Sequence, residues 1–132
     1  MTEKDTVQPA SPFTLNGKVA IVTGGGRGIG SAIVQRLVSA GASALVCDLD
    51  EDALHDMQAS VPDSERVTVT RGDLMDPDVP QQIVNAALQA FGAIDIIVNC
   101  AGFSWDSVIQ KTSDEQFLAM LNIHVVAPFP PK

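Results

Sequence analysis

Nine residues near the start of the sequence, Thr23 to Ser31, hold glycines in a spacing that can bind an anion. Before them, residues 18–22 form a short apolar run rich in β-branched side chains. After them, Ile29, Ile33 and Leu37 recur at helical spacing. The glycines therefore stand where a buried strand turns into a helix. Small residues let a ligand approach the backbone, and the free N–H groups at the start of the helix favour a negative charge. The stretch predicts phosphate binding.

Two familiar phosphate-binding patterns do not fit this loop. Residues 25–30 match the first six positions of a P-loop, but Ser31 and Ala32 follow where that pattern requires Lys and Ser or Thr. Nothing would then reach a γ-phosphate or hold magnesium. The strict G-x-G-x-x-G dinucleotide pattern fails because Ile29 stands at its last glycine position. A longer spacing, T-G-x-x-x-G-I-G, fits residues 23–30.

This longer spacing resembles the cofactor loop of the classical short-chain dehydrogenases/reductases. The resemblance covers residues 17–129, and residues 105–129 look most like bacterial 3-oxoacyl-carrier-protein-reductase-like members. A glycine-rich strand–helix turn with no ligand is the alternative. The resemblance implies a dinucleotide cofactor, and the loop residues that would contact it are Gly24, Arg27, Gly28, Ile29 and Gly30.

Asp48 lies eighteen residues after Gly30, at the end of the second predicted strand. Dinucleotide-binding sites place a carboxylate there to accept hydrogen bonds from the ribose hydroxyls of adenosine. A 2′-phosphate would face the same negative charge, so Asp48 favours NAD over NADP. Arg27 weakly favours NADP instead, because a basic residue in the loop can neutralise a phosphate. The alternative is a solvated acid at a strand end. We predict NAD as the cofactor.

Two further stretches resemble family positions at the ends of the third and fourth predicted strands. Asp73 and Leu74 resemble a pair whose acid hydrogen-bonds the adenine amine, with an ordinary Gly-Asp turn as the alternative. Residues 99–102 resemble the family's N-N-A-G turn, in which small residues let the backbone pass close to the cofactor ribose, although Cys100 replaces the second Asn. A simple strand terminator is the alternative here. The residues implied in this turn are Asn99, Ala101 and Gly102.

The family's catalytic residues are missing from these 132 residues. The resemblance implies a Tyr-x-x-x-Lys pair whose Tyr transfers a proton while hydride moves to or from nicotinamide, but the sequence contains no Tyr. Counted from Phe117, the family's upstream Asn position falls on His124. A helix-face His satisfied by a neighbour explains His124 better than a catalytic role. We therefore predict no catalytic residue.

The elements that must position these residues alternate between strand and helix. Predicted strands cover residues 18–22, 44–47, 67–70 and 94–98. The last of these is apolar enough to be buried on both faces. The first predicted helix covers residues 28–40, Asp50 caps the second, Asp76 caps the third with Pro77 at its first position, and Ser113 opens the fourth with a capping box. This order predicts an α/β fold: a Rossmann-type doubly wound parallel sheet, truncated after its fourth strand, with strand order 3-2-1-4.

The composition of the chain excludes some classes of partner and indicates a cellular location. The 132 residues are 45% hydrophobic, enough for one core, and the net charge of −8 without a basic cluster argues against nucleic acid and anionic membranes. The first fifteen residues lack a signal-peptide core, and no apolar run approaches the roughly twenty residues that span a bilayer. Cys47 and Cys100 end predicted strands that lie two positions apart in the sheet. They should therefore be roughly 10 Å apart, too far for a disulfide. We predict a cytoplasmic location.

The predicted organisation is a flexible lead-in at residues 1–16, an incomplete dinucleotide-binding domain at 17–129 and a divergent tail at 130–132, where two prolines stop a helix. We expect a truncated or interrupted copy of an oxidoreductase that interconverts an alcohol and a carbonyl, unable to turn over as it stands. Its fourth strand would leave an open apolar edge that allows self-association. The alternatives are a stand-alone nucleotide-binding or regulatory module and a non-functional remnant.

Overall fold

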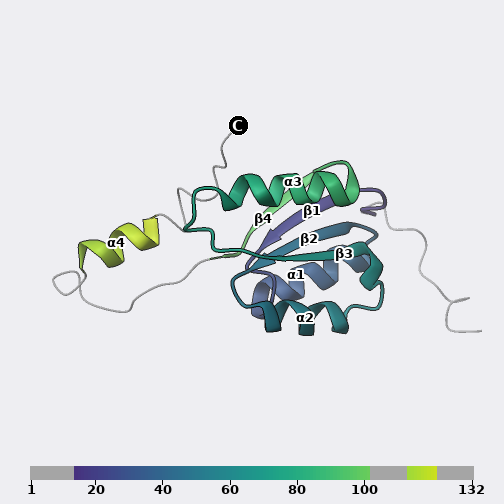
Figure 1. The fold of residues 1–132 in the computed structure, drawn as a ribbon. Helices are drawn as coiled ribbons and strands as arrows, with labels where there is room; N and C mark the ends of the chain where they lie inside the picture. The colour runs from purple at the N-terminus through teal and green to yellow at the C-terminus, as the bar shows by residue number, and fades with distance from the viewer. Residues whose placement is uncertain (1–13, 102–112, 122–132) are drawn as a thin grey trace, which may run out of the picture.

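A four-stranded parallel sheet is the framework of the molecule (Figure 1). The computed structural model describes residues 14–101 and 113–121. The strand order is β3-β2-β1-β4, and Ile21 of β1 lies between Leu45 of β2 and Ile97 of β4. This arrangement confirms the predicted α/β fold and the order 3-2-1-4. The strands are β1 (Val19–Thr23), β2 (Ser43–Asp48), β3 (Val67–Arg71) and β4 (Ile96–Asn99).

Helices cover both faces of the sheet. In Figure 1, α1 and α2 lie against one face and α3 lies against the other, which makes three layers. A short 3₁₀ helix before β3, η2 (Ser64–Arg66), was not predicted from the sequence. The α-helices are α1 (Gly28–Ser39), α2 (Glu51–Ser60), α3 (Val79–Phe91) and α4 (Asp114–Leu121). None of the helices within the described ranges is long and apolar enough to cross a bilayer.

The core is divided into two buried clusters, one on each face of the sheet. Successive side chains of a strand point to opposite faces, so neighbours along β1 and β2 enter different clusters. Val22 and Val46 pack with Val34 of α1 on one face. Leu45 packs with Ile83 of α3 on the other. Both faces of the central strands β1 and β2 are therefore covered by helices.

The helix caps predicted at Asp50 and Ser113 are confirmed, and α3 also ends at a glycine. The Asp50 side chain caps α2 by accepting a hydrogen bond from the Ala53 N–H at 3.0 Å. Gly92 ends α3 in the left-handed conformation, with φ of 78°. The Ser113 hydroxyl accepts from the Gln116 N–H at 3.1 Å, and the Gln116 side chain accepts in return from the Ser113 N–H, also at 3.1 Å. Each of these signals involves residues that lie close together in the sequence, so the sequence alone could reveal it.

The predicted start of the third helix was wrong. The helix begins at Val79, and Pro80 rather than Pro77 lies in its first turn. Asp76 does not cap it: the Asp76 side chain accepts from the Asp78 N–H at 2.9 Å and closes a turn before the helix. Asp and Asn side chains form such local turns as readily as they cap helices, so the residue type alone did not decide between them.

The prediction that the fourth strand is buried on both faces was also wrong. Ile96 and Val98 are half-buried, and the Ile97 side chain is 54% exposed. β4 ends the described sheet and pairs within it with β1 alone. Apolar composition predicted that this segment is a strand, but the neighbours of a strand determine how much of it is buried.

Candidate functional site

A cleft of about 610 Å³ opens at the carboxyl ends of the strands, where all four strand-end loops meet. This is the edge at which open α/β sheets bind their ligands. Gly28 opens α1 and Asn99 ends β4 beside the cleft, whereas Gly102 lies outside the described residues. Eight of the residues predicted to contact a cofactor line the cleft: Gly24, Arg27, Ile29, Gly30, Asp48, Asp73, Leu74 and Ala101.

Close backbone packing requires glycine at two positions of the loop after β1. Gly24 has φ of 67°, and a Cβ there would lie 2.7 Å from the Cα and the N of Ala101. A Cβ at Gly30 would collide with the Gly24 carbonyl group. The loop after β1 and the turn after β4 therefore touch backbone to backbone, which brings Ala101 to the glycine loop. This contact gives the predicted small-residue turn a physical reason.

The Thr23 hydroxyl ties the ends of β1 and β4 together. It donates a hydrogen bond to the Val98 carbonyl oxygen at 3.5 Å and accepts one from the Ala101 N–H at 3.3 Å. The Thr23 carbonyl oxygen also accepts from the Cys100 N–H at 3.2 Å. Thr23 is 7% exposed and satisfies its buried hydroxyl through these bonds. Sequence reasoning used this Thr only as part of a spacing and missed its positioning role.

The start of α1 offers free donors to an anion. Arg27 at the N-cap makes no side-chain capping bond, and the first turn of α1 contains no acidic residue. The first N–H groups of a helix have no partner within it, and the helix dipole makes that end positive. Ile29, in this first turn, is 78% exposed and borders the cleft. These features fit the phosphate binding predicted from the loop.

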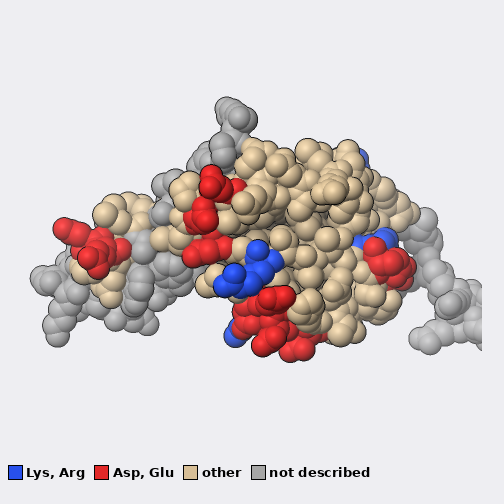
Figure 2. Space-filling view, viewed as in Figure 1, with Lys and Arg blue, Asp and Glu red and all other residues tan. Residues whose placement is uncertain are grey.

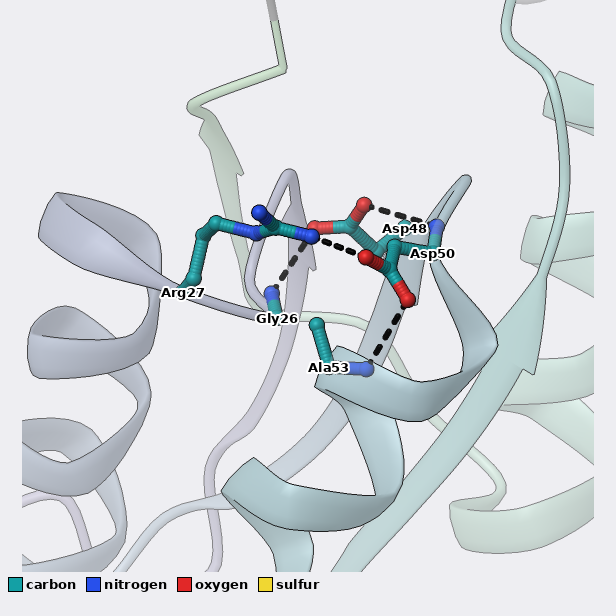
Figure 3. Close-up of polar contacts among 5 residues, drawn as sticks. All are labelled: Gly26, Arg27, Asp48, Asp50 and Ala53. Carbon is teal, nitrogen blue, oxygen red and sulfur yellow. Dashed lines mark hydrogen bonds and ion pairs between the residues drawn. The ribbon is translucent and has the colours of Figure 1, made fainter.

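Asp48 connects the end of β2 to the glycine loop (Figure 3). One carboxylate oxygen, Oδ2, accepts from the Gly26 N–H at 2.9 Å, and the other, Oδ1, accepts from the Asp50 N–H at 3.1 Å. An ionised carboxylate has about four lone-pair positions, so both oxygens can accept further hydrogen bonds from a ligand. The backbone thus holds Asp48 in a fixed orientation at the cleft.

Arg27 and Asp50 form an ion pair at the same end of the cleft (Figure 3). The Arg27 guanidinium donates to Oδ2 of Asp50, and the other oxygen of Asp50 caps α2. The Ala53 N–H, and to a smaller extent the positive charge of Arg27, hold the pKa of the Asp50 carboxyl below its usual range. Sequence reasoning identified Asp50 as a cap and Arg27 as a phosphate ligand but did not predict that they pair.

Asp73 and Leu74 line the part of the cleft beyond the end of β3. The Asp73 side chain is exposed and accepts a hydrogen bond from the Met75 N–H at 2.9 Å. Leu74 is half-buried and packs against the cluster beneath α3. The backbone N–H of Gly72 donates to the Asp48 carbonyl oxygen at 3.1 Å, which joins this turn to the end of β2. Asp73 therefore closes a local turn, which was the alternative interpretation from the sequence, and it also borders the cleft.

Two free cysteines also line the cleft. Cys47 is 1% exposed, and burial, together with the negative charge of Asp48, raises the pKa of its thiol to about 12. Its sulfur lies 3.8 Å from the Gly72 carbonyl oxygen. Cys47 is thus a neutral, buried group at neutral pH. Within the described ranges, no group of three or more His, Cys, Asp or Glu side chains could hold a metal ion.

Comparisons with known proteins agree with this fold. The short chain dehydrogenase family model matches residues 18–130, and the chain belongs to the short-chain dehydrogenase/reductase family. It is 43% identical over 89 residues to 3beta-hydroxysteroid dehydrogenase 2 of Eggerthella lenta, an alignment that covers 67% of this chain and 34% of that protein.

Solved structures of the family superpose closely on this chain. A short-chain dehydrogenase/reductase of Burkholderia phymatum in complex with NAD has a TM-score of 0.82 and 28% identity, covering 88% of this chain and 42% of that one. A 3-ketoacyl-(acyl-carrier-protein) reductase of Brucella melitensis complexed with NADH has a TM-score of 0.80 and 28% identity, covering 87% and 47%. The chain spans between a third and a half of the length of these relatives.

Proposed function

We propose that this chain binds NAD(H) in the cleft and supplies the cofactor-binding part of an oxidoreductase that interconverts an alcohol and a carbonyl group. The observation that carries the proposal is the half-buried Asp48 carboxylate, which the Gly26 and Asp50 N–H groups hold at the cleft beside the glycine loop. The pyrophosphate would lie at the start of α1, and the adenosine ribose would donate its hydroxyls to Asp48. The two related structures solved with NAD and NADH support this assignment.

The same carboxylate supports a preference for NAD over NADP. A 2′-phosphate carries close to two negative charges, and it would have to lie against Asp48. Arg27, the basic residue that could offset this repulsion, is paired with Asp50. The local charge therefore favours a ribose with free hydroxyls.

We assign cofactor binding, and not turnover, to these 132 residues. The Tyr-x-x-x-Lys pair that the family resemblance implies is absent, because the sequence contains no Tyr. The upstream position that falls on His124 lies outside the described residues. The substrate, a small alcohol or carbonyl compound, and a cytoplasmic location both stay predictions.

The edge of β4 supports self-association as a further part of this proposal. Ile97 is 54% exposed at the end of the described sheet, and unpaired strand edges favour pairing with another chain. We propose that a second copy of this chain pairs along β4.

The direct test of the function is a titration with NADH and NADPH, followed by the change in nicotinamide fluorescence. Asp48→Ala should weaken NADH binding by at least roughly tenfold, because it removes charge-assisted hydrogen bonds to the ribose. It should also lower the ratio of NADPH to NADH dissociation constants, which a general folding defect would not do. Asp56→Ala, at an exposed acid on α2, is the matched control and should leave both constants unchanged. Equal NADH affinity for the Asp48 variant and the control would reject the proposal.

A further inference from the structure

The Arg27–Asp50 ion pair joins the glycine loop to the start of α2 (Figure 3), and both residues line the cleft. The Arg27 side chain is 69% exposed and that of Asp50 is 43% exposed, so both are accessible to a ligand. Exposed pairs of this kind contribute little to folding stability.

The position of the pair relates it to Asp48. Asp48 accepts one hydrogen bond from Gly26, the residue before Arg27, and another from the backbone of Asp50 itself. Both partners of the ion pair are thus linked to the carboxylate proposed to bind the ribose: Asp50 through its own N–H group, and Arg27 through the N–H group of the preceding residue. A 2′-phosphate on that ribose would enter the space beside the Arg27 guanidinium.

Asp50 is held ready for this contact by the helix that it caps. One of its oxygens accepts from the Ala53 N–H at 3.0 Å, which fixes the side chain and leaves the other oxygen facing Arg27. The same bonds keep the pKa of Asp50 low, so the carboxylate is charged at neutral pH. Figure 2 shows acidic side chains gathered where α2 begins, so the surroundings of the pair are also negative.

We propose that Asp50 is a specificity-determining residue: by holding the Arg27 guanidinium, it withholds this cation from the 2′-phosphate of NADP. The inference rests on the proposed function, because it concerns the same ribose site. Asp48 repels the phosphate directly, whereas Asp50 acts through Arg27. Two acids separated by one residue would then select NAD in two different ways, and the second would depend on a contact that the fold creates.

Asp50→Asn tests the proposal with little disturbance of α2. Asn is as good an N-cap as Asp, so its side-chain oxygen can still accept from the Ala53 N–H while the negative charge is lost. The ligands are 5′-AMP and adenosine 2′,5′-bisphosphate, which differ by the 2′-phosphate alone, and their dissociation constants are measured by calorimetry. Asp56→Asn removes one charge from an exposed position on the same helix and serves as the charge-matched control.

The expected result is a gain in affinity for the bisphosphate. Asp50→Asn should tighten bisphosphate binding by about fivefold at most, because breaking an exposed ion pair releases no more than the pair was worth, and it should leave 5′-AMP binding within about twofold. The gain should be absent from the Arg27→Gln/Asp50→Asn double variant, because the released cation is the cause. Asp56→Asn should give no gain.

Two results would overturn the inference while the proposed function stands. One is an unchanged ratio of the two dissociation constants in Asp50→Asn. The other is an equal gain in the double variant, because this would mean that lost repulsion from Asp50, and not a released Arg27, improves phosphate binding. Failure of the function itself is distinguishable, since the unmodified chain would then bind neither 5′-AMP nor NADH with an affinity sensitive to Asp48→Ala.

Discussion

Replacing Gly24 by Ala should both destabilise the protein and weaken cofactor binding. Gly24 has φ of 67°, a conformation that costs an Ala residue about 1–2 kcal/mol. The added Cβ would also lie 2.7 Å from the backbone of Ala101, closer than real Cβ contacts approach. Backbone atoms cannot rotate away as a side chain does, so the turn after β4 must move. Such overpacking adds about 1–3 kcal/mol, for a total loss of about 2–5 kcal/mol.

Gly92→Ala separates the two costs. Gly92 also has a positive φ, of 78°, but a Cβ there would meet nothing within 4 Å, and the residue ends α3. This variant should lose the conformational part alone, about 1–2 kcal/mol. The difference between the two variants therefore measures the contact between the glycine loop and the turn after β4.

Urea denaturation followed by circular dichroism measures both losses. With a slope of about 1–3 kcal/mol per molar urea, the Gly24 variant should unfold at a midpoint roughly 1–2 M lower, and the Gly92 variant at one lowered by less than about 1 M. NADH affinity should fall in the Gly24 variant alone, because Ala101 lines the cleft. Equal midpoints for the two variants would show that the backbone contact at Gly24 does not constrain the loop.

Two further predictions follow from burial and exposure. Burial raises the pKa of the Cys47 thiol from 9.0 to about 12, so the unfolded chain ionises first, and the stability present below pH 9 is lost as pH rises toward 12. Urea titrations should show an unfolding free energy that is lower at pH 10 than at pH 8 by on the order of 1 kcal/mol from this group. Cys47→Ala should lack this part of the pH dependence, and an identical pH dependence in both proteins would contradict the assignment. Ile97→Lys should reduce self-association in sedimentation velocity, because an edge lysine opposes strand pairing. Leu88→Lys, at a 46% exposed position on α3, is its control, and an equal effect of both would count against pairing through β4.

The candidate site was largely predictable because its residues are marked by local patterns. The glycine spacing at the end of the first predicted strand and the acid at the end of the second both depend on short stretches of sequence. Parallel strands bring their carboxyl ends to one edge, so the order of elements sufficed to expect Gly24, Asp48 and Asp73 around one cleft. The cap at Asp50 was predictable for the same reason, since it joins residues three apart.

The errors concerned features that depend on neighbours in space. Asp76 has the residue type of a cap, yet it closes a turn before α3. The apolar sequence of β4 predicted burial on both faces, but the Ile97 side chain is 54% exposed because β4 ends the described sheet. In both cases the residue type was compatible with two environments, and the surrounding chain decided between them.

The sequence by itself therefore determined the order of the elements, the position of the glycine loop and the position of the acid after β2, because each follows from spacing along the chain. The tertiary structure decided what the charges of the site do. Arg27 and Asp50 are 23 residues apart, and they meet because β1 and β2 pair in parallel and bring their end loops together. The sequence suggested that Arg27 could neutralise a phosphate, but in the folded protein its guanidinium is paired with the Asp50 carboxylate.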